Sequence, residues 1–257
     1  MRVGLWVFGA CTAAAFAACG GSADEAAPQA AGTASPAISR GDTTAGSGPR
    51  AIEAGRPIVL FVGTSLTAGY GLDDPAREAY PAVLQRMADS AGLDVEMVNA
   101  GYSGETSAGA LRRVSWLLDR YGARTHVVVV ETGANDGLRA LDPDTMRTNI
   151  DSIVRLVQHR LPGAKVLLVQ MEAPPNLGAD YTRRFHAVFP AIARARDVTL
   201  LPFILEGVAG VARMNQGDGI HPTVQGAQVA ARNVWPGIRD AVERAVAPVS
   251  APVGQGS

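Results

Sequence analysis

The hydrophobic positions between about residue 57 and residue 245 alternate between short apolar runs and longer amphipathic stretches. Short apolar runs are typical of buried strands, and amphipathic stretches are typical of helices that pack on a sheet. The alternation predicts one α/β domain in which helices cover both faces of a parallel sheet. The predicted strands are 58–62, 95–99, 126–131, 165–170 and 199–201, and the predicted helices lie near 79–91, 107–121, 143–160, 180–195 and 224–245.

The loops that follow these strands are the first places to look for chemistry, because parallel sheets bind ligands beside the carboxyl ends of their strands. The loops are 63–71, 100–106, 132–138, 171–179 and 212–223. Polar residues with chemical capacity collect in four of the five. We therefore expect an active site along this edge of the sheet.

Composition narrows the class of protein. A chain of 257 residues with 47% hydrophobic content is long enough to bury one sizeable core. The net charge of −1 and the isoelectric point near 6.4 supply no basic field for nucleic acid, so we exclude that partner. Both cysteines lie in the first 20 residues, which leaves the domain without thiols for disulfides or a zinc cluster. We therefore expect no metal cluster in the domain.

The N-terminal 19 residues have the pattern of an export signal. Arg2 is followed by a mostly apolar run that is too short for a confident transmembrane helix. The run ends in Phe16-Ala17-Ala18-Cys19, which resembles a bacterial lipoprotein processing box with Phe16 in place of the usual Leu. Residues 1–19 therefore predict a lipoprotein-type signal peptide with lipidation at Cys19, and a protein anchored in the bacterial cell envelope. Ordinary cleavage and release, giving a periplasmic or secreted protein, is the alternative.

The segments on either side of the predicted domain are poor in large apolar residues. Residues 20–55 are mostly Ala, Gly, Ser, Thr and Pro, and they predict a flexible tether because such a segment buries too little surface to offset ordering. Residues 56–246 form the predicted domain, and residues 247–257 predict a disordered tail.

The loop after the first strand carries the candidate nucleophile. It reads Gly-Thr-Ser-Leu-Thr-Ala-Gly-Tyr-Gly over 63–71, with Ser65 third. A phosphate loop would need a Lys after its last Gly, and a dinucleotide fingerprint would need Gly-x-Gly-x-x-Gly; both are absent. A Gly-x-Ser-x-Gly elbow also fails, because Thr67 occupies its last position. Ser65 therefore lies at a strand-to-helix turn, where it is either a reactive hydroxyl or an ordinary helix cap.

The last loop supplies the partners that a reactive serine requires. Asp218 and His221 stand three residues apart on a segment constrained by Gly219 and Pro222. A serine hydroxyl becomes a useful nucleophile when an imidazole takes its proton, and a carboxylate must orient that imidazole. The alternative is that the two side chains only shape a turn.

Two further loops offer donors for the oxyanion that forms during acyl transfer. Gly104 lies in Ser-Gly-Glu-Thr after the second strand, where glycine allows close approach to an exposed N–H. Asn135 follows the third strand in Gly-Ala-Asn-Asp-Gly and offers a side-chain amide. Each loop alone is also ordinary turn chemistry.

Together the four segments resemble the SGNH/GDSL hydrolase family, in particular its arylesterase, acyl-thioesterase and lysophospholipase branch. The resemblance runs from about Pro57 to Ala245 and extends to Tyr70, Asn99, 174–176 and 201–203. It implies a flavodoxin-like three-layer α/β/α fold with a five-stranded parallel sheet. It also implies roles: Ser65 as nucleophile, Asp218 and His221 as its charge partners, and the Ser65 N–H, Gly104 N–H and Asn135 amide as the oxyanion hole.

One position departs from the family. Thr64 stands where the first motif usually has Asp. Since that acid is not the partner of His221, we expect an active enzyme with altered loop rigidity or specificity.

The predicted function is serine ester hydrolysis through an acyl-Ser65 intermediate, without a cofactor. The substrates expected are aryl or short-to-medium acyl esters, and thioesters or lysophospholipids are included. The apolar loop 171–177, followed by Tyr181 and Phe185, either lines an acyl pocket or is ordinary packing. The alternatives are an O-deacetylase of envelope polysaccharides, a non-catalytic binding relative on the same fold, and a flavodoxin-like cofactor protein. The sequence does not predict the oligomeric state.

Overall fold

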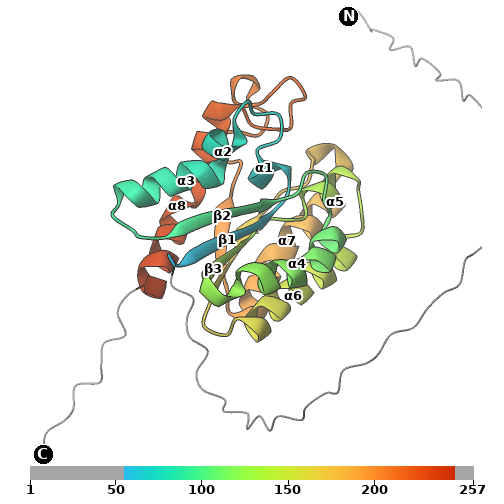
Figure 1. The fold of residues 1–257 in the computed structure, drawn as a ribbon. Coiled ribbons are helices and arrows are strands. Elements are labelled where there is room, and N and C mark those ends of the chain that lie inside the picture. The colour runs from blue at the N-terminus through green and yellow to red at the C-terminus, as the bar shows by residue number, and fades with distance from the viewer. Residues whose placement is uncertain (1–54, 247–257) are drawn as a thin grey trace, which may run out of the picture. The chain divides into compact units, whose positions relative to one another are not determined.

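The computed structural model describes residues 55–246 of the chain (Figure 1). The predicted signal peptide with Cys19, the predicted tether up to residue 54 and the predicted tail lie outside the described residues. Among residues 55–246, no helix combines the length and the apolar character needed to cross a membrane.

A five-stranded, all-parallel sheet forms the centre of the domain, with strand order β2-β1-β3-β4-β5. The predicted fold class is therefore confirmed. The central strands are buried on both faces, which explains their continuous apolar runs, whereas the edge strand β2 is only partly buried. The strands are β1 (Ile58–Gly63), β2 (Glu96–Gly101), β3 (Thr125–Val130), β4 (Lys165–Gln170) and β5 (Thr199–Phe203).

Helices cover both faces of this sheet (Figure 1). One face carries α3 (Tyr80–Ser90) and α8 (Val224–Val246), and the other carries α4 (Ser107–Tyr121), α6 (Pro143–Arg160) and α7 (Ala179–Arg196). These five helices were predicted within one or two residues, because each has an apolar stripe long enough to reveal a helical period.

The sequence did not predict the short helices, since they are too short to show a period. These are α1 (Ser65–Ala68), α2 (Pro75–Glu78), α5 (Ala134–Leu138) and the 3-10 turns η1 (Gly122–Arg124), η2 (Pro175–Leu177) and η3 (Ala212–Met214).

The order of the strands determines where a ligand binds. From β1 the chain moves to one side to form β2, then crosses back to the other side of β1 to form β3. The first connection runs through α3 and the second through α4, which lie on opposite faces. Because these connections diverge, a crevice opens beside the carboxyl ends of the strands at this switch in order. Ser65, Gly104 and Asn135 follow β1, β2 and β3.

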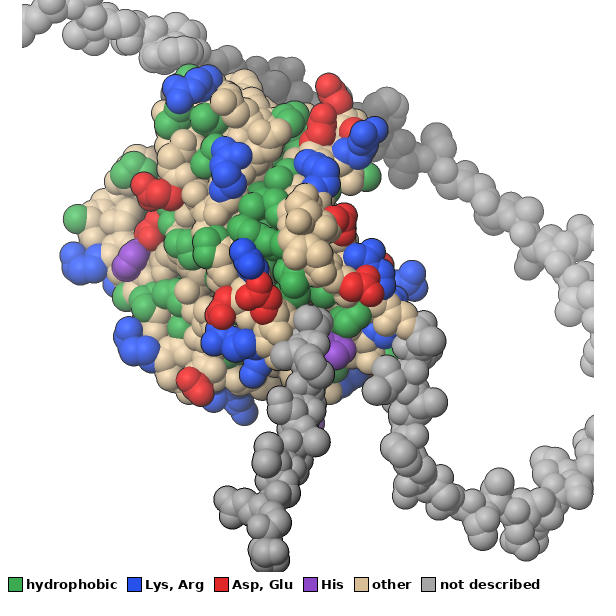
Figure 2. All heavy atoms as spheres, turned by 90° about the vertical axis from the view of Figure 1, so that its left-hand side faces the viewer, with side chains coloured by type: hydrophobic (Ala, Val, Ile, Leu, Met, Phe, Trp, Pro, Cys, Tyr) green, Lys and Arg blue, Asp and Glu red, His purple; other side chains and the backbone are tan. Residues whose placement is uncertain are grey.

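Acidic and basic side chains are interspersed over the face that Figure 2 presents, the one to which α3 and α8 belong. This face therefore does not display a single-sign field of the kind that attracts a nucleic acid backbone.

Candidate active site

Ser65 is the first residue of α1, directly beyond the carboxyl end of β1. Its side chain is half-buried, and its Oγ lies 2.9 Å from His221 Nε2. The two residues are 156 positions apart in the chain. The structure thus brings the predicted nucleophile and the predicted base within hydrogen-bonding distance.

The loop that carries His221 is shaped by its own hydrogen bonds. Asp218 Oδ1 accepts the backbone N–H groups of Ile220 and His221 at 2.9 and 3.0 Å. Asp218 Oδ2 lies 2.6 Å from His221 Nδ1. One carboxylate therefore both folds the turn and contacts the imidazole, so forming the turn does not conflict with the predicted role of Asp218 as charge partner.

The protonation of this pair follows from the contacts of Asp218. The hydrogen bond from His221 and the two backbone N–H groups lower the pKa of the Asp218 carboxyl to about 2. The carboxylate is ionised at neutral pH and only accepts hydrogen bonds. His221 Nδ1 must therefore carry a proton, which leaves Nε2 of the neutral imidazole free to accept the hydroxyl proton of Ser65.

Gln216 links the loop that carries His221 to the loop that follows Ser65 by hydrogen bonds. Its Nε2 donates to Tyr70 O at 2.8 Å and to Pro222 O at 2.9 Å, while its backbone N–H donates to His221 O at 2.7 Å. The ring of Tyr70 lies over the His221 ring with a centroid separation of 4.7 Å. Sequence reasoning missed Gln216, because its partner Tyr70 is 146 positions away.

The three predicted oxyanion donors lie in the loops that follow β1, β2 and β3. Within residues 55–246, the backbone N–H groups of Ser65 and Gly104 have no hydrogen-bonding partner. Gly104 has a φ of +77°, a conformation that favours glycine, and its carbonyl accepts a hydrogen bond from Arg139 at 2.9 Å. The amide of Asn135 donates one N–H to Glu105 O at 3.0 Å, which leaves its second N–H available.

Buried polar contacts hold these loops in place. Arg113 forms an ion pair with Glu105 at 2.7 Å and donates to Ala100 O at 2.8 Å, which ties α4 to the end of β2. Asp136 accepts the N–H and the hydroxyl of Ser107, which ties the Asn135 loop to the start of α4. The loop after β2, which carries Gly104, and the loop after β3, which carries Asn135, are therefore held in position relative to each other by α4.

Thr64, the position that departs from the family motif, is fully buried. Its hydroxyl and its backbone N–H both donate to the carboxylate of Glu131 at 2.9 Å. Glu131 is also fully buried, at the end of β3, and burial raises its pKa. The sequence indicated Glu131 only as the last residue of a predicted strand, so its position behind the nucleophile loop was missed.

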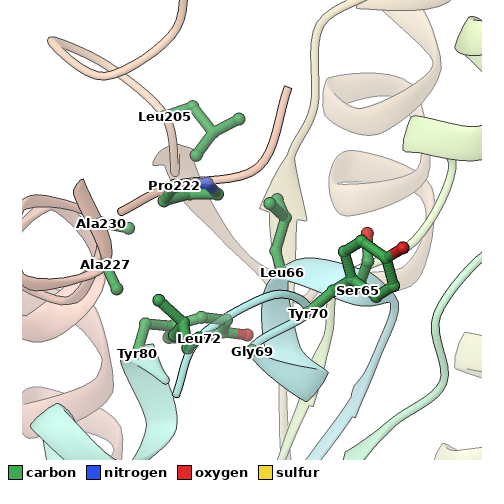
Figure 3. Close-up of a pocket in the computed structure, with 10 residues that line it drawn as sticks. All are labelled: Ser65, Leu66, Gly69, Tyr70, Leu72, Tyr80, Leu205, Pro222, Ala227 and Ala230. Atoms are coloured by element: carbon green, nitrogen blue, oxygen red, sulfur yellow. The ribbon is translucent and has the colours of Figure 1, made fainter. Parts of the chain in front are cut away.

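Two hollows adjoin Ser65. The smaller, about 10 Å³, lies between the nucleophile loop and α8, and Figure 3 shows Leu66 and Tyr70 on its walls. It is too small for a substrate. The larger is an open cleft of about 430 Å³, within the range of about 300–1,000 Å³ common for small-molecule sites.

Apolar side chains provide most of the wall of the larger cleft. They include Leu66, Leu138, Met171, Pro174, Phe203 and Ile220, beside Asn135 and Ser65. Of the two alternatives for this segment, residues 171–175 line the cleft, whereas Phe185 is fully buried in the core and Tyr181 packs beside it. For Phe185 the structure therefore selects ordinary packing, the second of the two alternatives that the sequence left open.

Comparisons with known proteins agree with this geometry. Residues 61–229 match the model of the GDSL-like lipase/acylhydrolase family. Esterase TesA of Pseudomonas aeruginosa is 40% identical over 187 residues, which cover 73% of this chain and 90% of that protein. Thioesterase 1/protease 1/lysophospholipase L1 of Escherichia coli K12 is 38% identical over 164 residues, 64% of this chain and 74% of that protein. The crystal structure of AlinE4, an SGNH-hydrolase family esterase, superposes with a TM-score of 0.60 at 38% identity, covering 76% of this chain and 98% of that one.

Proposed function

Because the chain belongs to the GDSL-like lipase/acylhydrolase family and is a serine hydrolase of acyl esters, we propose that Ser65, His221 and Asp218 are its catalytic triad. The observation that carries the proposal is the unbroken line of contacts from Asp218 to His221 at 2.6 Å and from His221 to Ser65 at 2.9 Å. Non-catalytic binding is not favoured, since the line of contacts is complete.

The first half-reaction forms an acyl-enzyme. Ser65 Oγ bonds to the acyl carbon while its proton moves to His221 Nε2, and the carbonyl π electrons move to the oxygen. The N–H groups of Ser65 and Gly104 and the Asn135 amide stabilise that oxyanion. When the carbonyl re-forms, the bond to the leaving oxygen or sulfur breaks, and His221 returns its proton to the leaving group.

The second half-reaction releases the acid. Water gives a proton to His221 Nε2 while its oxygen bonds to the acyl carbon, and the same three donors stabilise the second oxyanion. The bond to Ser65 Oγ then breaks, and His221 protonates the serine. Asp218 stays ionised throughout and stabilises the imidazolium that forms in each half-reaction.

The experiment for the triad combines labelling and kinetics. A fluorophosphonate probe followed by peptide mapping reports which serine reacts, and p-nitrophenyl butyrate measures turnover. We expect the label on Ser65, and loss of both label and turnover in Ser65→Ala. Ser152→Ala, the same change on the exposed side of α6, is the matched control and keeps both. Label on Ser103, or near-native kcat in Ser65→Ala, contradicts the proposal.

The substrate we propose is an ester or thioester with an apolar acyl chain of short to medium length. The apolar walls of the 430 Å³ cleft beside Ser65 support this class. Relatives named as an esterase and as a thioesterase and lysophospholipase agree with it.

A chain-length series of p-nitrophenyl esters tests this substrate class. Each methylene buried contributes about 0.8 kcal/mol, so kcat/KM should rise up to about fourfold per methylene until the cleft is filled. An acetyl ester that is hydrolysed better than the butyryl and octanoyl esters contradicts the class and favours an O-deacetylase.

We further propose that the protein is exported and anchored in the cell envelope through lipid on Cys19. The support is the apolar leader that ends in Ala17-Ala18-Cys19, which lies outside the described residues. The test is the distribution of the wild type and of Cys19→Ser between membrane and soluble fractions. Wild type in the membrane fraction and Cys19→Ser in the soluble fraction is the expected result, and an equal distribution contradicts the anchor.

A further inference from the structure

Glu131 places a carboxylate directly behind the nucleophile loop. Its side chain is 0% exposed, and three donors converge on it: Thr64 N and Thr64 Oγ1 at 2.9 Å and Thr67 Oγ1 at 2.8 Å. These donors belong to the residue before Ser65 and to the residue two positions after it. The carboxylate therefore contacts the loop on both sides of the nucleophile.

The same cluster is anchored to the rest of the domain. Thr67 Oγ1 also lies 2.9 Å from the hydroxyl of Tyr80 on α3, and Thr67 O accepts the amide of Asn99 on β2 at 2.6 Å. The first turn of α1 is thus tied to the end of β3 through Glu131, and to β2 and α3 through Thr67.

The chain leaves room for this carboxylate. A Cβ at Gly63 would lie 1.8 Å from Thr67 Oγ1 and 2.9 Å from Glu131 Oε2. Only glycine lets the backbone pass this close, so Gly63 is the condition for Glu131 to reach the loop.

Burying an ionised carboxylate costs free energy of folding, because the group loses its contacts with water. The three donors to Glu131 are neutral, and no cation within residues 55–246 forms an ion pair with it, so the desolvation of the carboxylate is offset by hydrogen bonds alone. An apolar side chain would avoid this desolvation cost but would leave the three buried donors without an acceptor. A destabilising group that contacts both sides of a nucleophile suggests a role in holding that nucleophile.

We propose that Glu131 is a positioning residue: its carboxylate oxygens hold the first turn of α1 so that the Ser65 hydroxyl and N–H point at the acyl carbon and oxyanion. The proposal rests on Ser65 being the nucleophile. Because the role is to accept hydrogen bonds, the glutamine oxygen keeps an acceptor for Thr64 N–H and Thr67 Oγ1, and the Thr64 hydroxyl rotates to accept from the glutamine NH2. Methionine has a similar length and removes both acceptors.

The experiment compares Glu131→Met with Glu131→Gln. A displacement of about 1 Å in a reacting group costs up to about 100-fold, so we expect Glu131→Met to lower kcat 10- to 100-fold with KM unchanged. The rate of labelling by a fluorophosphonate should fall in parallel. Glu131→Gln should keep kcat within about threefold of the wild type.

A matched pair controls for lost stability. Asp151 on α6 accepts two hydrogen bonds from Arg196 at 2.6 and 2.7 Å, on elements that do not carry Ser65. Asp151→Leu removes both acceptors there and Asp151→Asn removes one, as Glu131→Met and Glu131→Gln do behind Ser65. They should lower the thermal unfolding temperature and leave kcat unchanged.

Thr67→Val keeps the proposal testable if Glu131→Met does not fold. It deletes one of the three donors, and we expect kcat to fall about threefold to tenfold, with Thr67→Ser restoring it. Unchanged kcat in Thr67→Val and in any folded Glu131→Met overturns the positioning role. Activity that survives in Ser65→Ala instead overturns the proposed nucleophile, so the two failures are distinguishable.

Discussion

Replacing Asp218 with asparagine gives the sharpest test of the proposed triad, because the structure dictates how the new amide must turn. Asp218 Oδ1 accepts two backbone N–H groups, and Oδ2 faces His221 Nδ1. An asparagine has one acceptor and one donor group. If its oxygen stays with the two backbone donors, its NH2 faces Nδ1 and forces the histidine proton onto Nε2. That tautomer cannot accept the proton of Ser65.

The magnitude follows from the hydrogen bonds that compete. The opposite amide orientation keeps the productive tautomer but loses two backbone hydrogen bonds, which costs about 2 kcal/mol. The productive form is then disfavoured about 30-fold. Loss of the charge-assisted bond to the imidazolium costs about 2–3 kcal/mol more in each transition state. The sum of about 4–5 kcal/mol predicts a decrease in kcat of about 10³- to 10⁴-fold for Asp218→Asn.

The assay is steady-state hydrolysis of p-nitrophenyl butyrate, with thermal unfolding measured in parallel. Asp180→Asn is the matched control, since Asp180 is an exposed residue of α7 that forms an ion pair with Arg183, and its kcat should equal that of the wild type. A fall of less than tenfold in a folded Asp218→Asn would falsify the tautomer argument.

The other predictions concern the Asn135 amide, the hydrogen bonds of Gln216, and the two carboxyl groups with shifted pKa values, Asp218 and Glu131. Asn135→Ala should lower kcat about 10²- to 10³-fold with little change in KM, measured with the same ester. Gln216→Ala should lower kcat about tenfold and should also lower the thermal unfolding temperature, because it removes the hydrogen bond between the His221 loop and Tyr70. A lower unfolding temperature with unchanged kcat contradicts a role of Gln216 in positioning His221. The lowered pKa of Asp218 contributes stability that is present above its unfolded value of 3.8 and is lost as pH falls through about 2. The free energies of unfolding of the wild type and of Asp218→Asn, measured in urea between pH 2 and 5, should therefore converge at the acid end. Burial raises the pKa of Glu131, so its effect on the pH dependence of stability is opposite to that of Asp218. The folded state binds the Glu131 proton more tightly than the unfolded state, and its contribution to the free energy of unfolding therefore falls as pH rises above 4.5. Glu131→Gln should flatten this dependence of the free energy of unfolding on pH, measured by urea unfolding.

The structure shows why threonine fits at position 64, where the family motif has aspartate. The hydroxyl of Thr64 donates to Glu131, a role that an ionised aspartate has no proton to fill. Thr64 therefore fits the buried carboxylate behind it, and the loop keeps an ordered contact at the position where the family motif has an acid.

Local features carried most of what the sequence determined. The five strands and five long helices were predictable because each has its own period of apolar residues. Asp218 and His221 were predictable as a pair because they lie three positions apart in one turn, and the Asp218 carboxylate accepts a hydrogen bond from the backbone of that turn.

Only the tertiary structure decided which distant groups meet. Ser65 and His221 are 156 positions apart, Gln216 and Tyr70 are 146 apart, and Glu131 and Thr64 are 67 apart. No local period encodes these contacts; they follow from the strand order, which gathers the ends of β1, β2 and β3 at one edge. Burial is decided there too, since the same apolar residue type lines the cleft at Phe203 and fills the core at Phe185. Sequence alone identified which side chains have the chemistry, and packing determined which of them act together.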